Sequence, residues 1–303
     1  MRDSARQHAE AIAETIRRHG ATPDESHESV LQNGEEYASH DAYWLWCLRK
    51  SLALCEHSLY CPCAGARRDD LSILTPNGAL SGPDVPGMEL LLNRLKSEYC
   101  LSRALLYQSE TDDGRLKWNV DPCQGTFTDL LDDEVTGLEP EFLRTSFRLC
   151  FGILDRIARG VCEFLSLSTD RESIYFNSFW RAGGKENSRW DVLSTVSDPG
   201  IIALYSLATD LNEKGGGEWS RLKQYRNLFE HEVGIVCYGD ELESPAWLEP
   251  EKFRRISVRR LRSDATDALR FTRAAIFYFT FFVRSRRRVS TAQGHESTIT
   301  FSN

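Results

Sequence analysis

The sequence of 303 residues contains no long hydrophobic run. Its most apolar stretch extends only from Ala274 to Val283, whereas a helix that crosses a bilayer needs about 20 apolar residues. Residues 1–20 are too rich in charge for the hydrophobic part of a secretory signal. We therefore expect no membrane contact and a cytoplasmic location.

The sequence also lacks the glycine-rich motifs of several common enzyme classes. It has no phosphate-binding loop, dinucleotide fingerprint or hydrolase nucleophile elbow, and glycines 215–217 follow an expected helix, where they act as a stop. No segment repeats at the period of helical arrays, which argues against a repeat-built helical adaptor. No segment shows convincing polar and apolar alternation, as a half-buried strand would. The expected fold class is therefore all-α.

Nine cysteines without an export signal predict reduced thiols rather than disulfides. Cys55, His57, Cys61 and Cys63 form the exception to weigh, because four soft ligands for zinc lie within nine residues. The Cys-x-Cys step is tighter than the usual spacing of structural zinc sites, and no second ligand cluster follows it. We expect free thiols, no metal and no cofactor, with a zinc site as the open alternative.

Apolar spacing and turn-forming residues divide the chain into an N-terminal region and a larger helical domain. In the first region, residues 1–20 and Ala42–Leu59 read as helices. Residues 64–87 are rich in Gly, Pro, Asn and Asp and read as a linker. The expected division is residues 1–87 for the N-terminal helical region and linker, 88–290 for the helical domain, and 291–303 for a flexible tail.

Helical signals are stronger in the second region. Pro140 suits the first position of a helix, where its missing N–H costs nothing. Asp198 followed by Pro199 is a cap-and-start signal. The expected helices are Met88–Gln108, about Pro140–Leu167, a helix from Pro199 to the glycines at 215–217, about Glu218–Cys237, and a last helix from near Pro250 toward Arg288.

The net charge of −8 conceals a basic segment near the C-terminal end. From Glu251 to Arg288 there are twelve Lys or Arg and three Asp or Glu, a local balance of +9 that leaves −17 for the remainder. A basic segment on an acidic protein predicts a phosphate-binding surface, although a solvated helix face explains the same charges. We expect Arg284, Arg286, Arg287 and Arg288 to help bind RNA.

The helix expected over Glu218–Val236 has two different faces at about 100° per residue. An apolar stripe predicts contact with the core, and a second face carries polar or small residues. Leu228 and Ile235 flank this second face, and such an apolar margin favours contact with another helix or subunit. The stripe consists of Leu222, Tyr225, Phe229, Val233 and Val236, and the polar face of Lys223, Arg226, Asn227, Glu230, His231 and Gly234.

Arg226 and His231 carry the side chains that phosphodiester cleavage needs. Histidine exchanges a proton near neutral pH, and arginine pairs with phosphate oxygens. Along the helix axis their Cα atoms are expected to lie roughly 7.5 Å apart. Asn227 lies between them and can orient a hydroxyl or phosphate oxygen, while Lys223 and Glu230 are candidate substrate contacts. The plain alternative is an Arg226–Glu230 surface ion pair beside an ordinary surface histidine.

The segment RNLFEH, Arg226 to His231, resembles the Arg-Asn-x3-His form of the HEPN signature. Three upstream segments resemble those of a bacterial HEPN branch, in the same order. The resemblance covers roughly Met88 to Arg288, and Arg156 stands where that branch tends to have Lys. The three segments are FGILDRIARGVCEFL at 151–165, YFNSFW at 175–180 and ALYSLATDL at 203–211.

The resemblance implies a HEPN-type helical bundle and a metal-independent endoribonuclease that acts as a homodimer. In such enzymes the ribose 2′-hydroxyl attacks the adjacent phosphate, with His231 as general acid or base and Arg226 stabilising charge. Asp155, Trp180 and Asp210 would be structural. The implied role is a defence or toxin effector that acts on RNA, with a neutralising or regulatory protein as a further partner. The alternative is a non-catalytic HEPN module that binds RNA, nucleotide or a partner protein.

Overall fold

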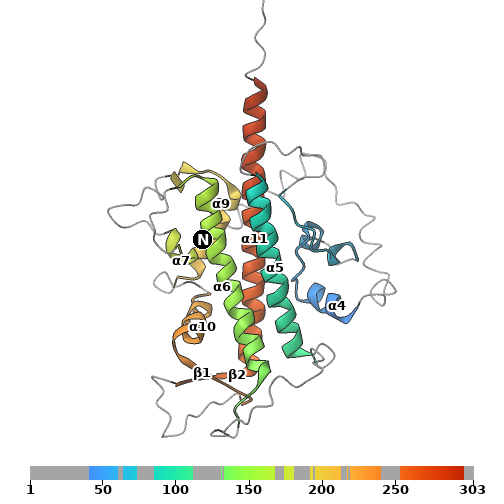
Figure 1. Ribbon diagram of the computed structural model, residues 1–303, viewed down its shortest axis with the longest axis vertical. Helices are drawn as coiled ribbons and strands as arrows, with labels where there is room; N and C mark the ends of the chain where they lie inside the picture. The colour runs from blue at the N-terminus through green and yellow to red at the C-terminus, as the bar shows by residue number, and fades with distance from the viewer. Residues whose placement is uncertain are drawn as a thin grey trace, which may run out of the picture. The chain divides into compact units, whose positions relative to one another are not determined.

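The computed structural model describes most of the chain as two compact units, Met1–Asp69 and Asp70–Asn303 (Figure 1). The expected helix over residues 1–20 lies outside the described residues. The predicted domain boundary after residue 87 and the predicted tail from 291 stay predictions. The described residues are 41–60, 64–73, 85–111, 131, 133–167, 174–180, 192–193, 195–212, 217, 219–239 and 253–296, with side chains up to Arg286.

In the first unit, α4 (Ala42–Arg49) is capped by Asp41, whose carboxylate accepts a hydrogen bond from Tyr43 N at 2.8 Å. The expectation that this helix continues to Leu59 is wrong. Ser51 has a φ of 59°, a left-handed conformation that interrupts a helix. Buried residues 52–55 then lead into two short 3-10 helices, η1 (Glu56–Leu59) and η2 (Ala64–Arg67).

The cysteine and histidine cluster belongs to this first unit. Cys55 is buried and its thiol lies 3.8 Å from Gly65 O, whereas His57 packs edge-on against Tyr60. Cys61 and Cys63 lie outside the described residues. The choice between free thiols and zinc therefore stays a prediction.

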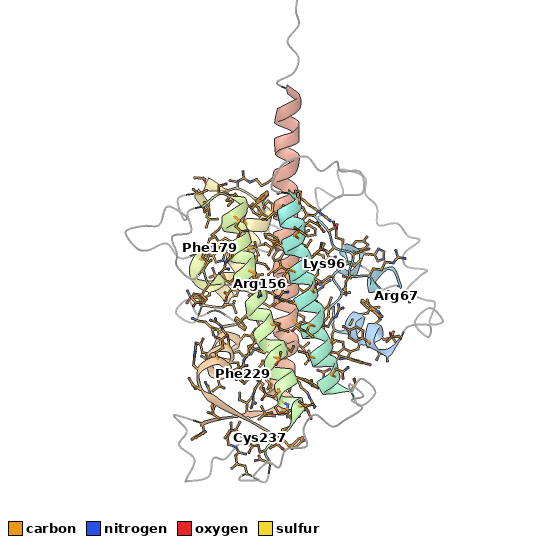
Figure 2. The ribbon with its side chains drawn as sticks, in the orientation of Figure 1. Arg67, Lys96, Arg156, Phe179, Phe229 and Cys237 are labelled. Atoms are coloured by element: carbon orange, nitrogen blue, oxygen red, sulfur yellow. The ribbon has the colours of Figure 1, made fainter. Side chains whose placement is uncertain are left out.

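The core of the second unit is formed by three long helices that run side by side (Figure 1). These helices are α5 (Val85–Glu110), α6 (Leu138–Phe164) and α11 (Val258–Glu296). Gly160 lies where the three meet, since a Cβ there would stand 2.4 Å from Leu91 Cδ2 and 3.2 Å from the Phe279 ring. Arg156 (Figure 2) links α6 to α5, since its Nη1 donates to the buried Glu98 Oε2 at 2.6 Å.

The helix α9 (Pro199–Asp210) packs on α11 and begins as the sequence predicts. The Asp198 carboxylate accepts hydrogen bonds from Gly200 N at 2.8 Å and Ile201 N at 3.3 Å. Gly200 lets the two helices approach, because a Cβ there would stand 2.7 Å from Tyr278 O. The short helix α7 (Phe176–Phe179) packs between α6 and α9 through contacts with both.

Two strands after α10 (Ser220–His231) correct the expected boundaries. The helix expected to reach Cys237 ends at His231, and the last helix begins at Val258 rather than near Pro250. Between them, β1 (Val233–Cys237) and β2 (Phe253–Ser257) form a parallel pair in which Val233 lies opposite Phe253 and Cys237 opposite Ser257. The reason is that a short run of β-branched apolar residues such as VGIVC fits a strand as well as a helix.

The described part of the chain is therefore predominantly helical, and the all-α expectation is confirmed with one small sheet added. Nowhere in the described residues is there a helix with both the length and the apolar character that a bilayer span requires. Phe229 on α10 and Cys237 on β1 lie near the end of the unit where the sheet is drawn (Figure 2).

Candidate functional site

The helix α10 is anchored to α6 by aromatic packing. Phe229 is 4% exposed, and its ring lies edge-on to Phe147 of α6 at a centroid distance of 5.7 Å. Tyr225 is half-buried and contacts the same Phe147 ring edge-on at 6.2 Å. Leu222 is buried on the same face. These three residues of the expected apolar stripe face inward and fix which side of α10 is left for polar residues. The other two lie on β1, where Val236 is buried and Val233 is exposed.

Two arginines of α6 hold the C-terminal end of α10. Arg148 Nη2 donates a hydrogen bond to Phe229 O, and Arg144 Nη2 donates to Gly234 O in β1. The last carbonyls of a helix have no partner within the helix and carry partial negative charge, so a cation there is favourable. Both contacts therefore fix the segment that contains His231, the last residue of α10.

The polar face of α10 brings Arg226, Glu230 and His231 together. Glu230 Oε2 lies 3.2 Å from Arg226 Nε and 3.8 Å from His231 Nε2, so one carboxylate oxygen faces both side chains. The Arg226–Glu230 ion pair named as the plain alternative is therefore present. The exposed fraction of the side chain rises from 21% for Arg226 through 32% for Glu230 to 72% for His231.

Arg226 also reaches two residues from earlier segments. Its Nη2 lies 3.8 Å from Asp155 Oδ2 on α6, and its guanidinium lies over the Tyr175 ring at 5.5 Å from the centroid. Asp155 in turn accepts a hydrogen bond from Phe176 N at 2.8 Å. Burial raises the pKa of Asp155 above its ordinary value, against the lowering effects of the Phe176 N–H and the Arg226 cation. Asp155 thus joins α6, α7 and α10.

The remaining predicted site residues are distributed along two helices. Asn227 is exposed and Lys223 half-buried, both on α10. Arg284 on α11 donates to Ser72 O, and its Nε is buried. It therefore belongs to the packing between α11 and the segment before α5, and no described contact joins it to Arg226 or His231. Arg286 is half-buried on α11, and the side chains of Arg287 and Arg288 lie outside the described residues.

The two residues of the expected apolar margin are buried as expected, but within their own chain, and Ile235 does not lie on the helix. Leu228 is 1% exposed, and Ile235 is 9% exposed and lies on β1 rather than on α10. Ile235 packs with Leu131, Cys237 and Phe253 within the same chain. Both residues are covered by their own unit, so they provide no argument for a contact with a second subunit.

The family resemblance gave Asp155 a structural role, but sequence reasoning missed its contact with Arg226 and the other residues that hold the signature pair in place. Asp155 and Tyr175 lie in segments with a recognisable family pattern, but no local signal shows that both face Arg226. Arg144 and Arg148 lie four apart on one face of α6, a spacing that marks a basic patch without naming its target. Their target, the carbonyls around the end of α10, depends on where α10 ends.

Comparison with known proteins identifies the family. A family model described as LA2681-like HEPN matches residues 80–286. No curated protein and no solved structure shows a significant match. The matched range contains α5, α6, α7, α9, α10, both strands and α11 up to Arg286. It covers more than half of the chain and includes the Arg226, Glu230 and His231 cluster, and the chain therefore belongs to the LA2681-like HEPN family.

Proposed function

We propose that this HEPN domain is a metal-independent endoribonuclease with His231 as its proton-transferring residue. One observation carries the proposal: a 72% exposed imidazole ends a helix in whose last turn Phe229 O accepts a hydrogen bond from Arg148, and Glu230 lies 3.8 Å from the imidazole Nε2. A carboxylate beside an imidazole can orient the ring. The histidine is thus held at its backbone and accessible at its ring.

The reaction is an internal transesterification of RNA. The 2′-oxygen forms a bond to phosphorus while the bond from phosphorus to the 5′-oxygen breaks, which yields a cyclic 2′,3′-phosphate and a 5′-hydroxyl. The proton that leaves the 2′-hydroxyl is balanced by the proton that the 5′-oxygen gains. Neutral His231 can accept the first proton, and protonated His231 can supply the second. No water, oxidant or reductant is consumed.

Arg226 supplies the positive charge next to this histidine. An arginine has five N–H donors, and in the described residues only Nε and Nη2 of Arg226 face carboxylates, those of Glu230 and Asp155. The remaining donors can contact a phosphate oxygen in which charge accumulates. We assign Glu230 to positioning His231 and Arg226, and Asn227 and Lys223 to contacts with the RNA strand.

A second candidate function is a non-catalytic HEPN module that binds RNA, nucleotide or a partner protein. The observation that favours it is the engagement of Arg226, which is only 21% exposed and faces two carboxylates and the Tyr175 ring. An arginine anchored in this way stabilises the domain whether or not RNA is cut. In this reading, His231 is an ordinary exposed histidine at the end of a helix.

The deciding experiment is incubation of the purified full chain with end-labelled RNA, with and without EDTA. We expect cleavage that survives EDTA, leaves a cyclic phosphate and is lost in His231→Ala. His57→Ala, which removes a histidine from the first unit, is the matched control. RNA in which 2′-O-methyl replaces the 2′-hydroxyl should remain intact. Cleavage unchanged in His231→Ala would end the ribonuclease proposal and leave the binding module.

Homodimer formation follows from the family resemblance alone, now that Leu228 and Ile235 are known to be buried. We propose that the enzyme acts as a homodimer and as an effector of the defence or toxin type. Light scattering on the purified chain at micromolar concentration tests the first part. A monomer that still cleaves RNA would remove the dimer from the proposal without touching the role of His231.

A further inference from the structure

A hollow of about 520 Å³ lies where β2 meets the start of α11, away from Arg226 and His231. Its volume falls in the range of small-ligand sites, roughly 300–1,000 Å³. Its wall is rich in positive charge, and no acidic side chain is among the described residues that line it. The polar lining consists of Tyr225, Arg255, Ser257, Arg259, Arg260 and Ser263.

The carboxylates that partner these arginines are not among the described residues that line the cavity. The Arg255 side chain is 6% exposed and pairs with Asp133. Arg260 Nε lies 3.0 Å from Asp264 Oδ2, and Asp264 is 1% exposed and also accepts from Arg221 Nε at 2.9 Å. One buried carboxylate is thus shared by two arginines. The arginines are fixed in position by these pairs, and Arg259 adds a further cation.

The charges at the N-terminal end of α11 are of the sign that destabilises a helix when no anion is bound there. The first turn carries Arg259 and Arg260 and no acidic residue. A helix N-terminus bears partial positive charge, so cations there cost stability while an anion is favoured. Such a departure from the usual charge preference of a helix end is typical of a functional site. A bound anion would offset the charge of both the arginines and the helix end.

The cavity is connected to the proposed active residues through α10. Tyr225 lines the cavity, and its side chain is hydrogen-bonded to Arg260, which donates to the phenol oxygen. His231 follows Tyr225 by six residues on the same helix, about 9 Å along its axis. One RNA strand can span that separation, so an anion in the cavity and a phosphate at His231 can belong to one molecule.

We propose that this cavity binds a backbone phosphate of the substrate RNA at a position beside the scissile phosphate. The inference rests on the proposed ribonuclease function and deepens it by placing an RNA contact at the start of α11. It adds Arg259 and Arg260 to the arginines of α11 that are expected to contact RNA, whereas Arg284 already donates to Ser72 O. Arg259 and Arg260 supply the charge-assisted contacts, and Tyr225 offers an aromatic edge to the strand.

Binding of a non-cleavable RNA tests the cavity separately from catalysis. The probe is a fluorescent single-stranded 2′-O-methyl oligoribonucleotide, titrated with the full chain at several salt concentrations. We expect Arg259→Gln and Arg260→Gln each to weaken binding about tenfold, as for a lost charge-assisted hydrogen bond. Each should also reduce the slope of log affinity against log salt by about 0.7, the value for one phosphate contact on a single strand.

Arg270→Gln is the matched control for Arg260→Gln. Both arginines lie on α11, both are about half exposed at 49% and 57%, and each pairs with an aspartate of the same helix. Only Arg260 lines the cavity. Equal losses in the two variants would overturn the proposal, because they would indicate a general charge effect.

Ser263→Glu keeps the test decisive if an arginine variant fails to fold. Ser263 is exposed on the cavity wall, so the change adds a negative charge without removing a buried group. We expect it to weaken oligonucleotide binding, and unchanged binding would overturn the proposal. The assignment to RNA would also be overturned if the chain bound pyrophosphate in the cavity but did not bind the oligonucleotide. If binding depends on the cavity residues but natural RNA is not cleaved, the RNA-binding role of the cavity is supported and the proposed ribonuclease function is rejected.

Discussion

The two signature residues of α10 lie on one polar helix face in very different surroundings. The Arg226 side chain is 21% exposed and contacts Asp155, Glu230 and the Tyr175 ring, which belong to three segments of the chain. The His231 side chain is 72% exposed and faces Glu230 alone among the contacts described for it. One half of the motif is therefore part of the packing, and the other half is presented to solvent. Replacing the first should affect both stability and chemistry, and replacing the second only chemistry.

The largest expected effect is on RNA cleavage in His231→Ala. A general acid or base contributes on the order of 10²–10⁴ in rate, and we expect a loss of that size. The midpoint of urea unfolding should stay unchanged, since the exposed imidazole makes little packing contact. Single-turnover cleavage rates and urea denaturation of the same preparation check both statements. A fall in stability as large as that of Arg226→Ala would remove the contrast between the two residues.

Arg226→Ala should lower both the cleavage rate and the free energy of unfolding. The change leaves the Asp155 carboxylate without its cation in a partly buried position, and we expect a loss of about 1–3 kcal/mol. Adding Asp155→Asn should restore part of that loss, because the uncompensated charge is then gone. Urea denaturation of the two single variants and the double variant measures this coupling. If the losses in free energy of unfolding of the two single variants simply add up in the double variant, the 3.8 Å approach of Arg226 to Asp155 contributes nothing to stability.

Cleavage rates of the Arg226 and His231 variants should not multiply. Residues that act on one phosphate behave as a unit, so Arg226→Ala with His231→Ala should be little slower than the slower single variant. A double variant whose loss equals the product of the two single losses would show that they act in separate steps.

Local signals predicted much of this architecture, and their failures have identifiable physical causes. The start of α9 was predictable because Asp198 and Pro199 cap a helix within a few residues. The end of α10 was not, because the VGIVC segment becomes a strand only by pairing with β2, which is distant in sequence. The expected position of Ile235 on the same helix was wrong for the same reason, since Ile235 lies on that strand.

In the candidate site, too, the features within one local segment were predictable and the contacts between distant segments were not. The pairing of Arg226 with His231 was predictable because both residues belong to one signature of six residues. The ion pair of Arg226 with Glu230 was also predictable, but the contacts with Asp155 and Tyr175 were not, because these residues meet Arg226 only after α6 and α7 pack. Charge counting predicted a basic α11 and named Arg284 as an RNA contact, which stays a prediction, but charge alone does not show which arginines line a cavity. Arg284 and Arg260 have the same charge, yet one donates to Ser72 O and the other lines a cavity.

Arg148→Ala should produce a smaller effect that spreads from α6 to the end of α10. The variant loses the hydrogen bond to Phe229 O, and we expect a stability loss of about 1 kcal/mol. It should also lower the cleavage rate, because the backbone that positions His231 loosens. Arg159→Ala, which removes an exposed arginine from the same helix, is the control. Equal rates in the two variants would show that the α6 contact does not position His231.

The smallest expected effect concerns the pH dependence of stability at Asp155. Burial raises its pKa in the folded chain above the unfolded value of 3.8. Between the two pKa values the folded state binds more protons than the unfolded state. Stability from this group is therefore fully present below the unfolded pKa and is lost as pH rises through the folded pKa. The presence of Arg226 reduces this loss but does not reverse its sign.

Asp155→Asn removes that titration and keeps an oxygen that can accept from Phe176 N. The stability of the variant relative to the natural chain should therefore increase as pH rises from below the unfolded pKa of 3.8 through the raised pKa of the folded state. Urea denaturation of both proteins at several pH values gives the difference directly, and Glu163→Gln controls for removal of an exposed carboxylate from α6. A difference that decreases with pH would mean that the Arg226 cation outweighs burial at Asp155. Arg226 would then be held in place mainly by charge. The stability that Arg226 contributes should in that case depend more strongly on salt than the stability that comes from the packing of α10 on α6.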